Sequence, residues 1–168
     1  MKKLIAIIFL ILFTSNVKAG CDDPLGDGVD YTNCRFSDGQ DLAGSYLPNS
    51  NLSFASFIQV NFDKSIMMNS ILSFGTFSES SFIRANLYES NLQGANFEKS
   101  NFTSANLTRV NFVGATLIEV NFQNSNLMEA NFTSSNITNA NFDGANLTGA
   151  TWTNGQTCGP ESIGTCKQ

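Results

Sequence analysis

Large apolar residues recur at every fifth position of the chain from residue 42 to residue 152. The series contains no insertion, and its 23 positions hold only Leu, Phe, Met, Ile or Trp. Two residues before each of them, 18 of the 23 positions hold Ser or Ala, and the position between is Asn in 14 of 23 pentads. A period of five fits neither an α-helix nor a β-strand of period two. The pattern predicts a chain that turns one corner per pentad.

A second period of twenty residues sorts the large apolar residues by type. Steps of twenty divide the series into four stacks, of which one is nearly all Phe and the next nearly all Leu. These two stacks are Leu42, Phe62, Phe82, Phe102, Phe122, Phe142 and Leu47, Met67, Leu87, Leu107, Leu127, Leu147. Because like residues fall on like residues, aromatic rings can stack directly above one another. A coil of another length would scatter Phe among the four stacks.

The pentads Ala85–Glu89 (ANLYE) and Ala95–Lys99 (ANFEK) resemble those of pentapeptide-repeat proteins, and the resemblance extends over residues 40–154. It implies an all-β fold, a right-handed quadrilateral β-helix with one pentad per side and about twenty residues per coil. In such a fold the large apolar residue and the small residue two before it point inward. We therefore expect an N-terminal cap segment at 20–39, the β-helix at 40–154 and a C-terminal cap segment at 155–168.

The first nineteen residues have the pattern of a cleavable signal peptide. Lys2 and Lys3 precede an apolar run over residues 4–13, and a polar stretch follows up to Ala19. Ten apolar residues span only ~15 Å as a helix, about half of a bilayer core, so no transmembrane segment is expected. The pattern predicts export to the periplasm or the extracellular space. The alternative is a lipoprotein anchored through Cys21, although Lys18 stands where an aliphatic residue is expected.

Four cysteines flank the repeat, with Cys21 and Cys34 before it and Cys158 and Cys166 after it. An even number of cysteines in an exported chain favours disulfides. In the rod that the resemblance implies, two of the three connectivities would join opposite ends, far beyond the ~7 Å limit between Cα atoms. This leaves Cys21–Cys34 and Cys158–Cys166, each stapling an end segment over exposed strand edges. A metal site is the alternative, but the two pairs would lie too far apart to share one ion.

Composition and charge argue against most catalytic functions. The 168 residues include no His, the commonest general base and metal ligand. With the cysteines assigned to disulfides, we expect neither enzymatic activity nor a cofactor. Without residues 1–19, six basic side chains face fourteen acidic ones, and a formal charge of −8 disfavours nucleic acid as a partner.

Aspartates gather in the N-terminal cap segment. The cluster consists of Asp22, Asp23, Asp27, Asp30 and Asp38. Carboxylate oxygens are the ligands that Ca²⁺ takes in proteins, so a Ca²⁺ site is one alternative. Because the spacing fits no Ca²⁺ loop, we expect a solvated acidic loop and no metal.

Outward positions of neighbouring coils carry charges of alternating sign. The two predicted ion-pair ladders are Glu79, Lys99, Glu119 and Glu89, Arg109, Glu129. Each exposed contact would contribute ~0.2–1 kcal/mol. We also expect the outward Asn residues to form side-chain hydrogen bonds between coils. Both features predict structural rather than catalytic roles.

Some outward positions are apolar and define a candidate partner surface. The candidate residues are Phe54 and Phe74 on one face and Met68, Tyr88 and Met128 on another. The repeat also departs most from its motif over residues 66–74, where Ile replaces Asn twice. A partner would contact the rod at such positions.

Two functions follow from these observations. The first is an exported, non-catalytic scaffold that binds an unknown protein or cell-envelope component. The second comes from the resemblance, since some pentapeptide-repeat proteins mimic duplex DNA and protect DNA gyrase from quinolones. The export signal argues against the second function, and so does the alternation of acidic residues with Lys99 and Arg109.

Overall fold

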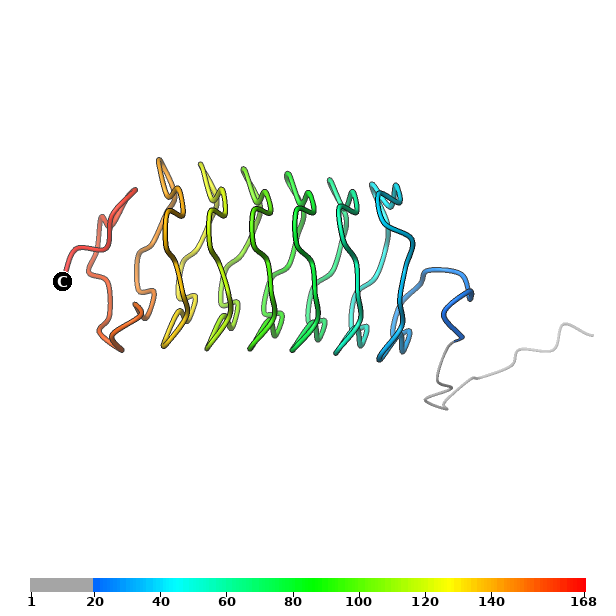
Figure 1. Cartoon of the computed structure of the whole chain (residues 1–168). Coiled ribbons are helices and arrows are strands. Elements are labelled where there is room, and N and C mark those ends of the chain that lie inside the picture. Colours follow the sequence, from blue (N-terminus) through cyan, green and yellow to red (C-terminus); the bar gives the residue numbers. More distant parts are fainter. Residues whose placement is uncertain (1–19) are drawn as a thin grey trace, which may run out of the picture.

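The computed structural model describes residues 20–168, which form a β-helical rod of stacked four-sided coils (Figure 1). These residues contain no helix and no extended strand. Each pentad contributes one isolated parallel bridge followed by a two-residue turn, from Asp30↔Asn51 to Asn131↔Thr151. Partners inside the repeat lie twenty residues apart, so the right-handed quadrilateral β-helix predicted from the sequence is confirmed. The predicted signal peptide, residues 1–19, lies outside the described residues.

Four of the five backbone N–H groups in a repeat pentad have backbone acceptors. Three donate to the coils above and below, as when Asn91 donates to Ser70 O (2.9 Å) and Leu92 donates to Asn111 O (2.8 Å). The fourth closes the turn at the corner, as when Ala95 donates to Leu92 O (3.2 Å). The coil therefore satisfies its own polar backbone without regular strands.

The repeated Asn supplies the acceptor for the fifth N–H group. All fourteen of these Asn residues accept, through Oδ1, the N–H of the residue two positions later. The expected Asn–Asn bonds between coils are fewer, for example from Asn106 to Asn86 (3.0 Å). The main role of the Asn differs from the prediction because its short side chain reaches its own backbone most directly.

The interior of the rod is a continuous stack of rings and aliphatic side chains. Phe102 is fully buried, with its centroid 4.7 Å from that of Phe82 and 5.5 Å from that of Phe122 in nearly parallel stacks. The small residue two positions earlier, such as Ala105 before Leu107, also points inward and leaves room for these rings. Burying each large residue contributes ~1.5–3 kcal/mol as an upper estimate, so the core is the main source of stability.

A partial coil precedes the repeats inside the N-terminal cap segment. Tyr31 and Phe36 occupy inward positions, and Phe36 stacks on Phe57 at 4.2 Å. The bridge Arg35↔Ser56 spans 21 residues rather than twenty, because one extra residue separates Phe36 from the regular series. The sequence pattern did not show this partial coil, since the extra residue breaks its period.

The two caps cover only part of the strand edges that the sequence predicted them to cover. The amides of Asn51 and Ser56 donate to the cap carbonyls of Val29 and Cys34, each at 2.8 Å. At Tyr46, by contrast, no backbone hydrogen bond to the cap is present within residues 20–168. At the other end, the C-terminal segment adds the antiparallel bridges Asn146↔Ile163 and Thr151↔Thr157.

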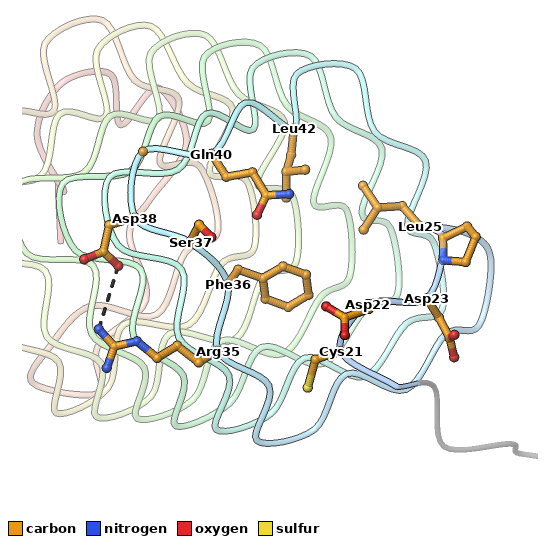
Figure 2. A pocket seen from close by; sticks show the side chains of 12 residues that line it. Cys21, Asp22, Asp23, Leu25, Arg35, Phe36, Ser37, Asp38, Gln40 and Leu42 are labelled. Atoms are coloured by element: carbon orange, nitrogen blue, oxygen red, sulfur yellow. Dashed lines mark ion pairs between the residues drawn. The ribbon is translucent and has the colours of Figure 1, made fainter.

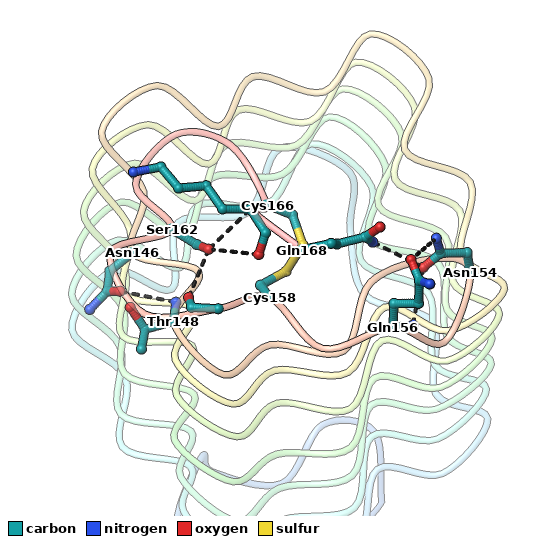
Figure 3. Close-up of a disulfide and its surroundings, with 10 residues drawn as sticks. Asn146, Thr148, Asn154, Gln156, Cys158, Ser162, Cys166 and Gln168 are labelled. Atoms are coloured by element: carbon teal, nitrogen blue, oxygen red, sulfur yellow. Dashed lines mark hydrogen bonds between the residues drawn. A yellow bond between two sulfur atoms is a disulfide. The ribbon is translucent and has the colours of Figure 1, made fainter.

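Each cap contains one disulfide. Cys21 is joined to Cys34 with 5.4 Å between Cα atoms, and Cys158 is joined to Cys166 with 5.0 Å. Figure 3 shows that the second disulfide lies across the C-terminal end of the coil. These are the two pairs expected from the sequence, and neither spans the length of the rod.

We expect thiol titration of the oxidised protein in denaturant, without reductant, to detect no free thiol, because all four cysteines are paired. After reduction the same assay should detect four. Two free thiols before reduction would contradict this pairing, and a lipid on Cys21 would contradict soluble export.

Candidate interaction surface

One of the two predicted ion-pair ladders is present. Arg109 donates to Glu89 Oε1 (3.1 Å) and to Glu129 Oε2 (2.7 Å), which joins three successive coils. Hydrogen bonds from Tyr88 and Arg109 lower the pKa of Glu89, and those to Glu129 and Glu89 raise the pKa of Arg109. These groups are exposed to solvent, so the ladder contributes little to stability.

The second predicted ladder does not form through Lys99. Its Nζ lies 3.8 Å from Glu98 Oε1 in the same pentad, whereas Glu79 Oε2 accepts a hydrogen bond from Gln59 (2.9 Å). A neighbouring carboxylate is closer to the flexible Lys side chain than those one coil away. The prediction was therefore wrong about the partners of Lys99.

A hollow of about 560 Å³ opens at the N-terminal end of the rod. Figure 2 shows the Phe36 ring near the middle of this end, with Leu42 above it and Asp22 and Asp38 on either side. Asp38 lies 4.0 Å from the Arg35 guanidinium. The hollow is the open end of the coil, with an apolar floor and a charged rim.

Several of the cap aspartates have structural partners. Asp23 Oδ2 accepts the Gly20 N–H (2.7 Å), and Asp27 Oδ1 accepts a hydrogen bond from Asn49 (2.9 Å). Within residues 20–168, no three His, Cys, Asp or Glu side chains come close enough together to hold a metal ion. The Ca²⁺ alternative therefore finds no ligand cluster in this part of the chain.

Within residues 20–168, five of the six exposed large apolar residues lie in two successive coils near the N-terminal end, and the sixth, Ile163, lies in the C-terminal cap segment. We call the group of five the apolar patch, and it consists of Tyr46, Phe54, Ile66, Ile71 and Phe74. Phe54 and Phe74, expected from the sequence, are 57% and 53% exposed. The pattern did not single out Tyr46, and the only signal for the two Ile residues was the loss of Asn from the motif.

The other candidate residues lie outside the apolar patch. Met68, Tyr88 and Met128 are only half-buried and do not form a second exposed group. The Tyr88 hydroxyl accepts a hydrogen bond from Arg109 (3.2 Å), which places it against the ion-pair ladder. The sequence pattern placed these residues on one face but could not show how much of each side chain is exposed to solvent.

Phe54 and Phe74 hold an unfavourable backbone conformation. Their φ angles are 59° and 58°, in the left-handed region that costs an L-residue ~1–2 kcal/mol, and both rings face solvent. Their only ring partner among the described residues is each other, in a stack with centroids 5.3 Å apart. The corner residues of other pentads, such as Lys64 and Glu79, have the same φ, so what sets Phe54 and Phe74 apart is the exposure of their apolar rings, which is typical of a partner surface.

The fold and the surface define a β-solenoid repeat protein with an exposed apolar patch. The sequence profile of the pentapeptide-repeat family matches residues 41–73, 80–117 and 111–149 in eight copies. The chain belongs to this family, whose members are generally structural or binding proteins rather than enzymes.

Solved structures with the same fold include full-length QnrB1, described as a plasmid-mediated fluoroquinolone resistance protein. This chain is 24% identical to it with a TM-score of 0.69, over 74% of this chain and 65% of QnrB1, less than two thirds of that protein. A trypsin-treated QnrB1 variant is 23% identical with a TM-score of 0.54, over 79% of this chain and 75% of that one. Rfr23 from the cyanobacterium Cyanothece is 23% identical with a TM-score of 0.48, over 68% and 84%. No curated protein sequence matches this chain.

Within residues 20–168, no helix is long and apolar enough to cross a membrane.

Proposed function

We propose that this protein is an exported, non-catalytic scaffold that binds a protein or cell-envelope component through the apolar patch. The observation that carries the proposal is the concentration of five exposed apolar residues in two coils. In most other pentads, the positions of Tyr46, Ile66 and Ile71 hold Asn, whose side chain accepts a backbone N–H, as Asn91 does from Gln93. The two disulfides support an oxidising compartment, as does the N-terminal sequence pattern.

Gyrase binding by DNA mimicry is the second candidate function. It is supported by the fold shared with QnrB1, which is described as a fluoroquinolone resistance protein, and by the acidic charge. Two observations argue against this function. Arg109 lies between Glu89 and Glu129, so these acidic residues form no continuous negative stripe. Gyrase is also cytoplasmic, whereas we propose that this protein is exported. Cell fractionation separates the two functions, because an uncleaved cytoplasmic protein would favour gyrase binding and contradict export.

Replacing both patch aromatics should strongly weaken partner capture. We expect the amount of partner that the variant Phe54→Asn/Phe74→Asn recovers from periplasm or medium to fall at least about tenfold, because buried aromatic anchors dominate such interfaces. Asn already occupies the same pentad position, with positive φ, at Asn69 and Asn124, so the variant should fold.

The matched control is Lys64→Asn/Arg84→Asn, which changes the same pentad position at the opposite corner of the coil. This control should leave capture unchanged. Equal capture by the wild type and the Phe variant would reject the apolar patch as the binding surface. Loss with the control alone would assign binding to the two cations instead.

A further inference from the structure

The row of corner residues that contains the two patch aromatics combines a ridge with a notch. We call it the aromatic corner row, and it runs Phe54, Phe74, Gly94, Gly114, Ser134, Asn154. Two bulky residues are thus followed, at the same twenty-residue spacing, by two glycines. All four of these residues have φ between 58° and 66°, so they occupy equivalent places on successive coils.

The two glycines play different roles. A Cβ on Gly94 would lie 2.6 Å from Phe74 Cε1, so the Phe74 ring covers this glycine. A Cβ on Gly114 would meet nothing within 4 Å, so the row is open there. The adjacent Val113 side chain is apolar and half-buried. The row therefore presents an aromatic ridge and, two coils further on, a corner position without a side chain, which we call the notch.

We propose that a second copy of this chain binds the aromatic corner row in an antiparallel, two-fold dimer. Phe54 of each copy fills the notch beside Gly114 and Val113 of the other. Because both rods have the same coil spacing, this register also brings the two Phe74 rings, each covering the Gly94 of its own copy, against each other at the axis. A two-fold interface needs one self-complementary surface, and a ridge and a notch on the same row supply it.

The charge distribution favours a second copy at this row. With −8 on each mature chain, two copies repel, and the repulsion is smallest where no charge faces the partner. Over residues 40–154, all of which the structure describes, this corner row carries no charged residue. The other three rows carry Lys64 and Arg84, or Glu89, Arg109 and Glu129, or Glu79, Lys99 and Glu119.

The width of the contact sets its strength. One corner row offers a smaller contact area than the roughly 800 Å² per partner that a standard stable interface buries. The dimer should therefore dissociate on dilution. This inference rests on the proposed function, because it names the partner of the same apolar patch.

Sedimentation velocity of the mature protein over a concentration series tests the proposal. The wild type should pass from monomer to dimer as concentration rises. Gly114→Asn should raise the dissociation constant at least about tenfold, because the new side chain occupies the notch. The monomer should be unaffected, since a Cβ meets no atom there and Asn accepts positive φ at this pentad position.

The control is Gly44→Asn, at the same pentad position, with φ 69° and equally open space around its Cβ. It should dimerise like the wild type. A wild type that stays monomeric at every concentration would overturn the proposal, as would a dimer insensitive to Gly114→Asn. A monomeric wild type whose Phe54→Asn/Phe74→Asn variant loses a captured partner would overturn the dimer but leave the proposed function intact.

Discussion

Phe102→Ala should lower the free energy of unfolding by about 3–5 kcal/mol, measured by urea denaturation followed by circular dichroism. Phe102 is fully buried and stacks on Phe82 and Phe122. It also meets Phe97 and Phe112 edge-on, at centroid distances of 5.3 and 6.3 Å. Coils on both sides are held by backbone hydrogen bonds, so they cannot collapse into the cavity left by the ring.

Two controls separate cavity formation from general sensitivity. Gln123→Ala changes an exposed side chain and should cost less than about 0.5 kcal/mol. Phe142→Ala removes a ring from the last regular coil, where it is 9% exposed and stacks on one Phe only. That variant should lose less stability than Phe102→Ala, because a terminal coil can fray without opening its neighbours. Equal losses at Phe102 and Phe142 would contradict a core that is tightest at its centre.

The regular part of the fold could be predicted from the sequence because each pentad repeats the same physical requirement. Leu92 and Phe102 recur in register since each coil must supply one large inward residue per side. The Asn position is equally regular, yet its role could not be inferred from spacing alone. Whether Asn91 bonds to the next coil or to the amide of Gln93 depends on geometry that only the structure shows.

The ends and the surface could be predicted less well, for identifiable reasons. Phe36 is part of the stacked core, but one extra residue takes it out of the period. The partners of Lys99 depend on side-chain rotamers, which a repeat pattern does not specify. The ridge and notch required knowing which way the Phe74 ring lies, because Gly94 and Gly114 are identical in sequence terms.

Removing one disulfide should open its own cap and leave the other cap closed. Cross-links across 13 and 8 residues each stabilise by about 2–3 kcal/mol through loop entropy. In Cys21→Ala/Cys34→Ala, the amides of Asn51 and Ser56 should exchange hydrogen roughly 30- to 150-fold faster, because their acceptors lie in the N-terminal cap. Hydrogen exchange resolved by residue measures this directly.

The reciprocal variant Cys158→Ala/Cys166→Ala supplies the matched control. It should accelerate exchange at Leu147 and Gly149, whose amides donate to Ser162 O (2.7 Å) and Cys158 O (2.9 Å). Asn51, at the far end, should remain protected, because each coil of a solenoid contacts only its neighbours and an opened end stops at the next intact coil. Faster exchange throughout the rod in either variant would contradict this locality and would mean that the caps hold the whole β-helix together.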